Sequence, residues 1–235
     1  MLNMPRCLES ELLDELLPYD PRAIRSRRDL RRINVLMMNT AIVAHALDRA
    51  FPATPPRTII EIGAGDGTFA LRLAKRNTVR WRNVQVVLLD RQDIVSSATR
   101  KQLSSLGWQT SVVMAEVFEW LTRPVDQVFD VMIANLFLHH FDDVKLRALL
   151  SLAAQRTRVF VACEPRRSAW ALAGSRLLGV IGCNDVSRHD AVVSVRAGFD
   201  GQELSAVWPA DSAWTLQESA RGLFSHCFVA ARYGE

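Results

Sequence analysis

The chain has 235 residues, of which 49% are hydrophobic and 23% are charged, and its 29 basic and 25 acidic side chains leave a net charge of +4 at pH 7. This composition excludes a disordered or fibrous protein and is sufficient for one globular domain with additions. No apolar run reaches the roughly 18–20 residues of a membrane-spanning helix, because the candidate at residues 131–138 is short and contains Asn135. We therefore expect no membrane span.

The cysteines are too scattered for a CxxC metal or redox pair and too few for a disulfide scaffold; they are Cys7, Cys163, Cys183 and Cys227. Acidic residues interrupt the first apolar stretch at Glu9, Glu11, Asp14 and Glu15, a pattern that argues against a secretory signal peptide. We therefore expect a cytoplasmic protein.

The first fifty residues are expected to be helical. Residues 8–17 and 29–50 have helical periodicity, and a turn at residues 18–21 separates them. Prolines then mark a boundary at Pro52, Pro55 and Pro56. We predict an amino-terminal helical cap at residues 1–52 and a main domain at residues 53–235.

Six arginines fall within eleven residues of this cap, at Arg22, Arg25, Arg27, Arg28, Arg31 and Arg32. They form either an anion-binding surface or the solvated face of a helix, and we favour the helix face. No aromatic side chains interleave with these arginines, and the net charge of the chain is small. We therefore expect no nucleic-acid partner.

From residue 58 onward, short apolar strands alternate with helical segments. We predict strands at residues 58–62, 84–89, 109–114, 128–134 and 158–163, and helices at residues 68–76, 93–106, 116–121 and 142–154. Strands that are apolar on both faces and separated by helices indicate a parallel sheet covered on both sides. The expected fold class is therefore α/β, doubly wound and mostly parallel.

The alternation ends after Cys163. We predict a helix at residues 168–178, a loop at 179–190 and a short helix at 191–195, and we assign residues 166–200 to an insertion on the substrate side. Two strands, at residues 203–208 and 223–232, are expected to flank a polar loop through Asp211. These two would pair as an antiparallel hairpin at the sheet edge and complete a seven-stranded sheet.

The strand at residues 58–62 runs directly into three glycines, Gly63, Gly65 and Gly67, before a helix. In an open parallel sheet the ligand crevice lies at the carboxyl ends of the strands, and glycines let the backbone approach a ligand closely. Thr68 stands where the dinucleotide pattern GxGxxG has its third glycine, and the Gly-Lys-Ser/Thr of a P-loop is absent. The loop thus predicts a ligand other than a nucleoside triphosphate and weakens the case for NAD.

This segment, Glu61-Ile62-Gly63-Ala64-Gly65-Asp66-Gly67, resembles the first motif of class I S-adenosylmethionine-dependent methyltransferases, and the resemblance extends over residues 57–164. It implies a Rossmann-like methyltransferase fold and S-adenosylmethionine as the cofactor. The turn formed by Gly63, Ala64 and Gly65 would pass beside the amino-acid part of the cofactor, and Glu61 would help to hold its ammonium group.

Other cofactor contacts are expected at the ends of the next strands. Asp90, with Arg91 beside it, ends the second strand, where its carboxylate can accept from both ribose hydroxyls. The resemblance further implies that Glu116 and Val117 lie at the adenine and that Asn135 and Leu136 lie near the sulfonium. Each residue also has a purely structural alternative: the glycines in a tight turn, and Asp90 and Glu116 at helix starts.

The candidate catalytic residues follow the fourth and fifth strands. His139 and His140 come directly after the fourth strand, and either imidazole could act as a base during methyl transfer. Glu164 ends the fifth strand and is a second candidate to face the acceptor, and His189 with Asp190 is a third. Alternatively, one imidazole caps or packs against the helix at residue 142 while the other faces outward. No spacing such as HExxH is present, so we expect no metal.

The acceptor is partly constrained by missing motifs. The chain has neither the Asn/Asp-Pro-Pro-Tyr signature of nucleobase and glutamine amino-methyltransferases nor the Pro-Cys dipeptide of cytosine C5 enzymes. Residues 29–34 and 184–190 are similar to methyltransferases found beside type III polyketide synthases. We therefore predict O-methylation, or less readily C-methylation, of a small phenolic, quinone or polyketide-type compound by a monomer or homodimer. The alternatives are a NAD(P)-dependent oxidoreductase and a catalytically silent nucleotide-binding relative.

Overall fold

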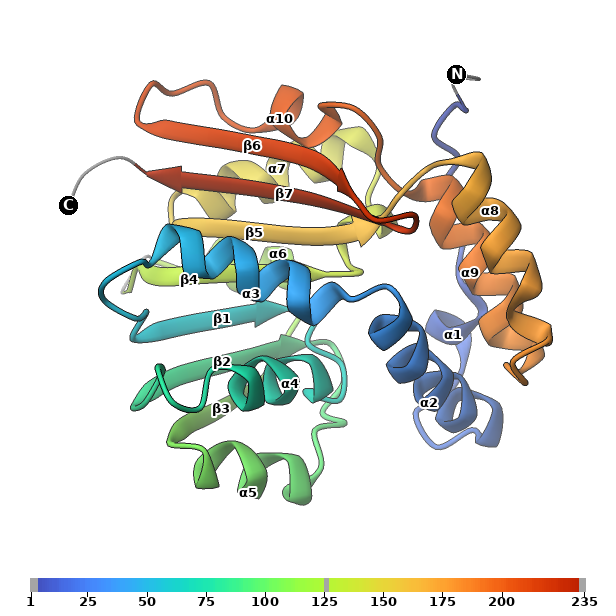
Figure 1. Ribbon diagram of the computed structural model, residues 1–235, viewed down its shortest axis with the longest axis horizontal. Helices are drawn as coiled ribbons and strands as arrows, with labels where there is room; N and C mark the ends of the chain where they lie inside the picture. The colour runs from blue at the N-terminus through green and yellow to red at the C-terminus, as the bar shows by residue number, and fades with distance from the viewer. Residues whose placement is uncertain (1–3, 125–126, 233–235) are drawn as a thin grey trace.

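The computed structural model describes residues 4–124 and 127–232. Seven strands within these residues form one sheet in the order β3-β2-β1-β4-β5-β7-β6 (Figure 1). The strands are β1 (Thr58–Ile62), β2 (Val84–Asp90), β3 (Trp108–Met114), β4 (Phe129–Asn135), β5 (Thr157–Pro165), β6 (Trp214–Arg221) and β7 (Ser225–Arg232). The first five are parallel to one another, while β7 runs antiparallel to both β5 and β6.

Ten α-helices and two 3₁₀ turns are found in the same residues. The helices are α1 (Leu12–Glu15), α2 (Pro21–Leu36), α3 (Asn39–Ala50), α4 (Thr68–Arg76), α5 (Ser97–Ser105), α6 (Val117–Leu121), α7 (Asp143–Ala154), α8 (Ala169–Arg176), α9 (Asp185–Ala197) and α10 (Glu203–Val207). The 3₁₀ turns are η1 (Leu138–His140) and η2 (Leu177–Gly179). None of these helices combines the length and apolarity needed to span a bilayer.

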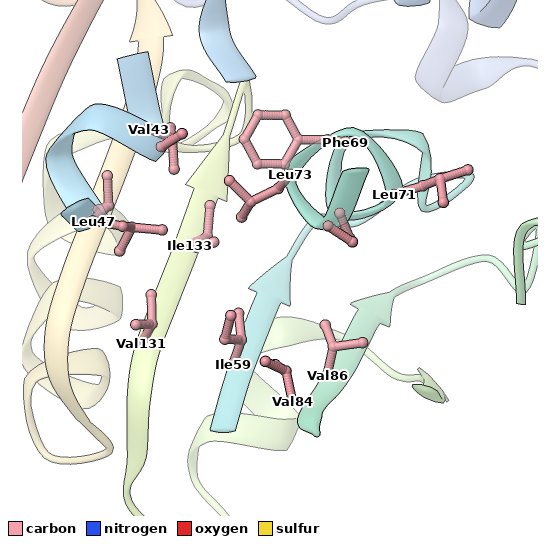
Figure 2. Packing of buried hydrophobic residues seen from close by; sticks show 14 of the residues in the cluster. Val43, Leu47, Ile59, Phe69, Leu71, Leu73, Val84, Val86, Val131 and Ile133 are labelled. Carbon is pink, nitrogen blue, oxygen red and sulfur yellow. The ribbon is translucent and has the colours of Figure 1, made fainter. Parts of the chain in front are cut away.

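The core lies on both faces of the sheet because successive strand side chains point to opposite faces. On one face Ile59 of β1 and Ile133 of β4 pack with Val43 of α3 and Leu73 of α4, as Figure 2 shows. On the other face Ile60 packs in a cluster that includes side chains from α6, α7 and α10. The predicted doubly wound α/β fold with an antiparallel edge pair is therefore confirmed.

The sheet order reverses between β1 and β4, the two neighbours that continue in opposite directions. A crevice is expected at the carboxyl ends of the strands on either side of such a reversal. Beyond these ends lie α1, α2, α8 and α9 (Figure 1), and α9 contacts each of the other three. The separation of a cap at residues 1–52 from the main domain, with an insertion at 166–200, stays a prediction.

The prediction for residues 203–208 was wrong, because they form the helix α10 and not a strand. Leu204 and Trp208 are four residues apart and both buried, the spacing of one helix face. The Glu218 carboxylate accepts from the backbone N–H groups of Leu204 and Ser205 and so satisfies donors at the helix start. The sixth strand is β6 (Trp214–Arg221), which lies entirely within the segment predicted to be a polar loop.

Other helix boundaries also differ from the prediction. The helices predicted at residues 8–17 and 93–106 are confined to Leu12–Glu15 and Ser97–Ser105, and three further differences each follow from one residue. The segment at residues 29–50 is divided between α2 and α3, which meet at Met38, where φ is +58°. Asp20 caps α2 so that this helix starts at Pro21, earlier than predicted. Asn184 accepts from Ser187 N–H and starts α9 within the predicted loop 179–190. In each case a single capping or left-handed residue decides the boundary.

Candidate functional site

One cavity of about 980 Å³ lies at the carboxyl ends of β1, β2 and β4, walled on its outer side by residues of α1, α2, α8 and α9. Its lining includes every residue that the sequence assigned to cofactor binding, together with both candidate histidines. These are Glu61, Gly63, Ala64, Gly65, Asp90, Arg91, Glu116, Val117, Asn135, Leu136, His139 and His140. Residues that lie far apart in the sequence are therefore brought to one site.

The glycine turn after β1 is held tightly against the rest of the site. Gly63 has a φ of +68°, and a Cβ atom there would lie 2.2 Å from the Phe137 ring. Gly65 has a φ of +55°, but a Cβ at this position would meet nothing within 4 Å. Only glycine adopts such left-handed backbone without strain. Gly63 thus gives room to a neighbouring ring, whereas Gly65 leaves space open beside the turn.

Asp90 links the end of β2 to this turn. Its Oδ2 accepts from Gly65 N–H at 2.8 Å, and its Oδ1 accepts from Gln92 N–H at 2.9 Å. Each carboxylate oxygen has two lone pairs, so both oxygens can still accept from a ligand. The neighbouring Arg91 contacts Asp14 at 3.3 Å instead, which turns its charge toward α1. The carboxylate is therefore oriented in advance by backbone donors.

Glu61 is a buried acid on the cavity wall, 2% exposed, and its Oε2 has no hydrogen-bond partner. Burial raises the pKa of Glu61 well above its ordinary value, and the nearby charges of Asp66 and Asp90 raise it further. An unpartnered buried carboxylate oxygen is costly, and a cationic ligand group beside it would remove that cost. The position therefore fits the ammonium group of an amino acid.

Glu116 and Val117 stand at the start of α6. Glu116 Oε2 accepts from the N–H groups of Phe118 and Glu119, so the structural alternative of a helix-start acid is present in the structure. Val117 is buried behind it. Because Glu116 also lines the cavity, its second carboxylate oxygen is available to a ligand there.

Asn135, at the end of β4, is part of a network of amides. Its Oδ1 accepts from Asn39 at 3.0 Å, and its Nδ2 donates to Asn34 at 3.2 Å. The following residue, Leu136, has a φ of +52° and donates its N–H to Cys163 O. These contacts fasten the junction of α2 and α3 to the end of β4, beside the cavity.

His139 lies between two carboxylates and is 3% exposed. Its Nδ1 is 2.8 Å from Glu164 Oε2, and its Nε2 is 3.2 Å from Glu11 Oε1. Burial lowers the pKa of His139, but the hydrogen bonds and charges of Glu11 and Glu164 outweigh it and raise the pKa to about 9. At neutral pH this imidazole is therefore protonated and donates to both carboxylates. Glu11 is the residue of this group that the sequence did not single out.

Glu164 lies beneath η1 and is absent from the residues that line the cavity. It is fully buried, and it accepts from the backbone N–H groups of Phe137 and Leu138 as well as from His139. The sequence-based hypothesis that Glu164 faces an acceptor therefore does not match its position. Its carboxylate orients the turn that carries both histidines.

His140 is the histidine that is partly exposed to the cavity. Its Nδ1 lies 3.6 Å from Asp14, and its ring centroid lies 4.3 Å from that of His139. Burial lowers the pKa of His140, and the positive charge of His139 lowers it further. His140 is therefore the neutral imidazole of the pair at neutral pH and is able to accept a proton.

The remaining candidate pair, His189 and Asp190, takes part in contacts between helices. Asp190 accepts from the N–H groups of Leu12 and Leu13 and contacts His189 at 3.1 Å, so it anchors α1 to α9.

One ligand atom from each of Glu11, His139 and His140 lies within 4.8 Å of the others. Both ring nitrogens of His139 are already engaged by carboxylates, Nδ1 by Glu164 and Nε2 by Glu11. The absence of a metal stays a prediction.

Residues 59–159 match the family model described as a methyltransferase domain. Among solved structures, plantazolicin methyltransferase BpumL in complex with SAH is similar, with a TM-score of 0.66 and 10% identity over 91% of this chain and 91% of its own. An O-methyltransferase family protein from Burkholderia thailandensis has a TM-score of 0.58 and 17% identity over 92% of this chain and 62% of its own.

Magnesium protoporphyrin IX methyltransferase (ChlM) from Synechocystis PCC 6803, with bound SAM, has a TM-score of 0.54 and 14% identity over 88% of this chain and 83% of its own. The comparison with curated protein sequences gave no match. At these identities the structural likenesses establish the fold, and the family match concerns the segment that contains β1 to β4 and the glycine turn.

Proposed function

We propose that the chain is a class I S-adenosylmethionine-dependent methyltransferase that methylates an oxygen of a small organic acceptor, a proposal that its match to a methyltransferase domain at residues 59–159 and its methyltransferase-like fold support. The observation that carries the proposal is the pair of acids around the glycine turn. Glu61 is buried with one carboxylate oxygen, Oε2, unpartnered on one side of the turn, and Asp90 is held at the end of the next strand.

In the proposed binding mode the amino-acid part of the cofactor lies against Gly63, Ala64 and Gly65. Glu61 receives the ammonium group, because its Oε2 lacks a donor in the free protein. Asp90 receives the two ribose hydroxyls with the lone pairs that Gly65 and Gln92 leave free.

We assign the adenine end to Glu116 and Val117 and the sulfonium end to Asn135 and Leu136. All four line the same cavity. Arg91 lines the same cavity and stays among the proposed cofactor-binding residues, although its guanidinium contacts Asp14 of α1. These assignments extend the family resemblance onto residues that the fold brings together.

When bound, the cofactor supplies a methyl group on a positively charged sulfur, a centre already activated for in-line displacement. The protein has to align an acceptor oxygen with that methyl group and remove the proton from the oxygen. His140 would take the hydroxyl proton of the acceptor, whose oxygen would then bond to the methyl group that the bound cofactor would supply, with the electron pair of the broken S–C bond staying on sulfur. A phenol has a pKa near 10, like tyrosine, so a neutral imidazole in contact with it is a suitable base.

His139 serves a different purpose in this mechanism. Its positive charge, held between Glu11 and Glu164, keeps the neighbouring His140 neutral and fixes the turn η1. Glu164 acts through the same turn by holding the N–H groups of Phe137 and Leu138. We therefore propose His140 as the base and treat His139, Glu11 and Glu164 as positioning residues.

The rest of the cavity favours an aromatic or otherwise apolar acceptor. Its outer wall carries apolar side chains, among them Leu30, Ile33, Met37, Leu177, Leu178 and Phe224. The solved neighbours are named for different acceptors, plantazolicin and magnesium protoporphyrin IX. The proposal of a phenolic, quinone or polyketide-type acceptor therefore depends on this wall and on the base at His140.

A radiolabelled methyl-donor assay across phenols, quinones and amines tests the proposal directly. We expect label in a phenolic or hydroquinone product and none in amines. Calorimetry with S-adenosylhomocysteine and with NADH distinguishes a methyltransferase from the alternative, a NAD(P)-dependent oxidoreductase. Tight NADH binding without a response to S-adenosylhomocysteine would reject the methyltransferase. Cofactor binding without transfer to any acceptor in the panel would favour the silent relative.

A further inference from the structure

The arginine-rich segment belongs mainly to α2, and its members have different surroundings. Four of them contact other parts of the protein: Arg22 contacts Asp20, Arg25 contacts Gly182 O, Arg27 contacts Pro18 O and Gln92, and Arg32 contacts Asp29. Arg28 is exposed. Arg31 differs from these, because it lines the cavity and crosses to the glycine turn, where its Nη1 donates to Asp66 Oδ2 at 2.7 Å.

A second arginine lies beside this contact. Arg72 of α4 lines the cavity and donates to the backbone oxygen of Arg31 at 2.9 Å. Burial lowers the pKa of Arg72, the charge of Asp66 opposes this, and the charge of Arg31 adds to it, so the three side chains share one electrostatic environment. Asp66 also acts on Glu61 by raising its pKa. Two guanidinium groups therefore stand at the same end of the cavity as the unpartnered acid.

An α-amino acid bound here would present two opposite charges on one carbon atom. If Glu61 receives the ammonium group, the carboxylate has to lie within a few ångströms of it and needs a cation. The described cations that line the cavity are Arg27, Arg31, Arg72, Arg91 and Lys145. Only Arg31 and Arg72 stand with Asp66 beside the turn that follows Glu61.

The other three cations are placed elsewhere. Arg27 is occupied by Pro18 O and Gln92, and Arg91 lies after β2 and faces Asp14. Lys145 belongs to α7, which follows the histidine turn η1. Arg31 has five N–H donors, and the contact with Asp66 uses one of them.

We propose that Arg31 binds the α-carboxylate of the cofactor, with Arg72 adding positive charge beside it. This assignment rests on the proposed function. A guanidinium suits a carboxylate because its donors match the two oxygens in a planar fork. Arg31 would then join α2 to the ligand as well as to the glycine turn, so an occupied cofactor site holds α2 over the cavity. The arginine-rich segment thereby contains one ligand-binding member among residues that contact the protein or solvent.

The test compares two ligands that differ in the amino-acid part. S-adenosylhomocysteine carries the carboxylate and the ammonium group, whereas 5′-methylthioadenosine keeps the adenosine and the sulfur but lacks both charged groups. Dissociation constants are measured by calorimetry for the wild type, Arg31→Gln, Arg31→Lys, Arg72→Gln and Arg28→Gln. Arg28 is the matched control, because it belongs to the same helix and is exposed.

We expect Arg31→Gln to raise the Kd for S-adenosylhomocysteine about tenfold or more, as for loss of a charge-assisted hydrogen bond. Its Kd for 5′-methylthioadenosine should stay within about twofold of the wild type. The Kd of Arg31→Lys for S-adenosylhomocysteine should lie between those of the wild type and Arg31→Gln, and the Kd of Arg28→Gln should match that of the wild type. The Arg31–Asp66 contact is partly exposed, so its loss should leave the fold intact.

Equal weakening of both ligands by Arg31→Gln would assign Arg31 to the structure of the site and overturn the proposal, and so would unchanged binding of S-adenosylhomocysteine. Failure of the wild type to bind S-adenosylhomocysteine would reject the proposed function itself. If affinity for S-adenosylhomocysteine is lost in Arg72→Gln but not in Arg31→Gln, the carboxylate would be assigned to Arg72, and this result would also overturn the proposal.

Discussion

His139 Nε2 lies 3.2 Å from Glu11 Oε1, although 128 residues separate the two in the sequence. The segment that carries Glu11 is tied to the same turn by Arg6, which donates to Phe141 O at 2.8 Å and contacts Asp143 at 3.0 Å. The amino-terminal segment therefore supplies part of the wall of the cavity. Its attachment depends on the protonation of His139, and this dependence leads to a measurable pH effect.

We expect the stability conferred by His139 to be complete below pH 6.5 and to be lost as the pH rises toward 9. The native pKa of about 9 lies above the ordinary 6.5, so the folded state binds this proton more tightly than the unfolded state. This difference in pKa corresponds to a contribution of at most roughly 3 kcal/mol to the free energy of unfolding. The lowered pKa of Glu11 arises from the same contact with His139 and is therefore no separate contribution. Urea unfolding of the wild type and His139→Gln at pH 6 and pH 9.5 measures the contribution of His139. A stability difference between the two proteins that is equal at both pH values would contradict this expectation.

His140→Ala should lower kcat by roughly 10², the usual contribution of a general base, and leave the Kd for S-adenosylhomocysteine nearly unchanged. In the wild type, kcat should fall as the pH drops through the lowered pKa of His140, because the protonated ring accepts no proton. Steady-state rates across pH test both points. His45→Ala on the exposed side of α3 is the matched control. Full activity in His140→Ala would show that alignment alone is sufficient.

Asp90→Asn should raise the Kd for S-adenosylhomocysteine about 10- to 100-fold, since in the proposed binding mode the carboxylate accepts from the ribose, and it also orients the glycine turn through Gly65 N–H. Asp93→Asn provides a control, because Asp93 contacts only surface groups such as Arg100 in the described residues. Calorimetry on both variants gives the comparison. Unchanged affinity in Asp90→Asn would remove Asp90 from the cofactor site.

A comparison of Gly63→Ala with Gly65→Ala should distinguish the cost of backbone strain from the cost of a steric overlap. Both positions have positive φ, so each alanine costs roughly 1–2 kcal/mol of stability. A Cβ at position 63 also overlaps the Phe137 ring, which adds roughly 1–3 kcal/mol. In thermal unfolding, Gly63→Ala should therefore have a lower Tm than Gly65→Ala. The additional loss of stability in Gly63→Ala should disappear when Phe137→Ala is combined with it. If the additional loss persists in the double variant, overlap with the Phe137 ring is not its cause.

At a pH below the raised pKa of Glu61 in the empty site, binding of S-adenosylhomocysteine should release a proton from this residue. In the empty site burial raises the pKa of this carboxyl, whereas an ammonium group beside it favours the ionised form and lowers the pKa again. Calorimetry in two buffers of different ionisation enthalpy counts the proton. Glu61→Gln should abolish the release and weaken binding. Equal proton release in the wild type and the variant would assign it to another group.

The sequence predicted elements well where the signal is local. The bounds predicted for β1 and α4 match the structure, because apolar alternation ends at glycines with positive φ and a helix follows directly. The gathering of the proposed cofactor-binding residues at one cavity could be predicted for a related reason: strands that run parallel bring their carboxyl ends to one edge of the sheet.

Features that depend on distant contacts could not be predicted in this way. The helix α10 gains its N-terminal hydrogen bonds from Glu218 on a later strand, and Glu11 reaches His139 from the other end of the chain. Glu164 has the position of a catalytic acid in the sequence, but three backbone or ring donors hold it beneath η1. Burial and partner choice of this kind are fixed only by the tertiary structure.

The position of β7 has a consequence for synthesis on the ribosome. This strand, at residues 225–232, enters the sheet between β5 and β6 and pairs with both, so neither has its full set of neighbours until β7 has left the exit tunnel. A nascent chain that already contains the glycine turn and both histidines still exposes the unpaired edge of β5. Such open edges recruit other strands, so chaperone contact during translation should concentrate on the interval between the emergence of β5 and that of β7.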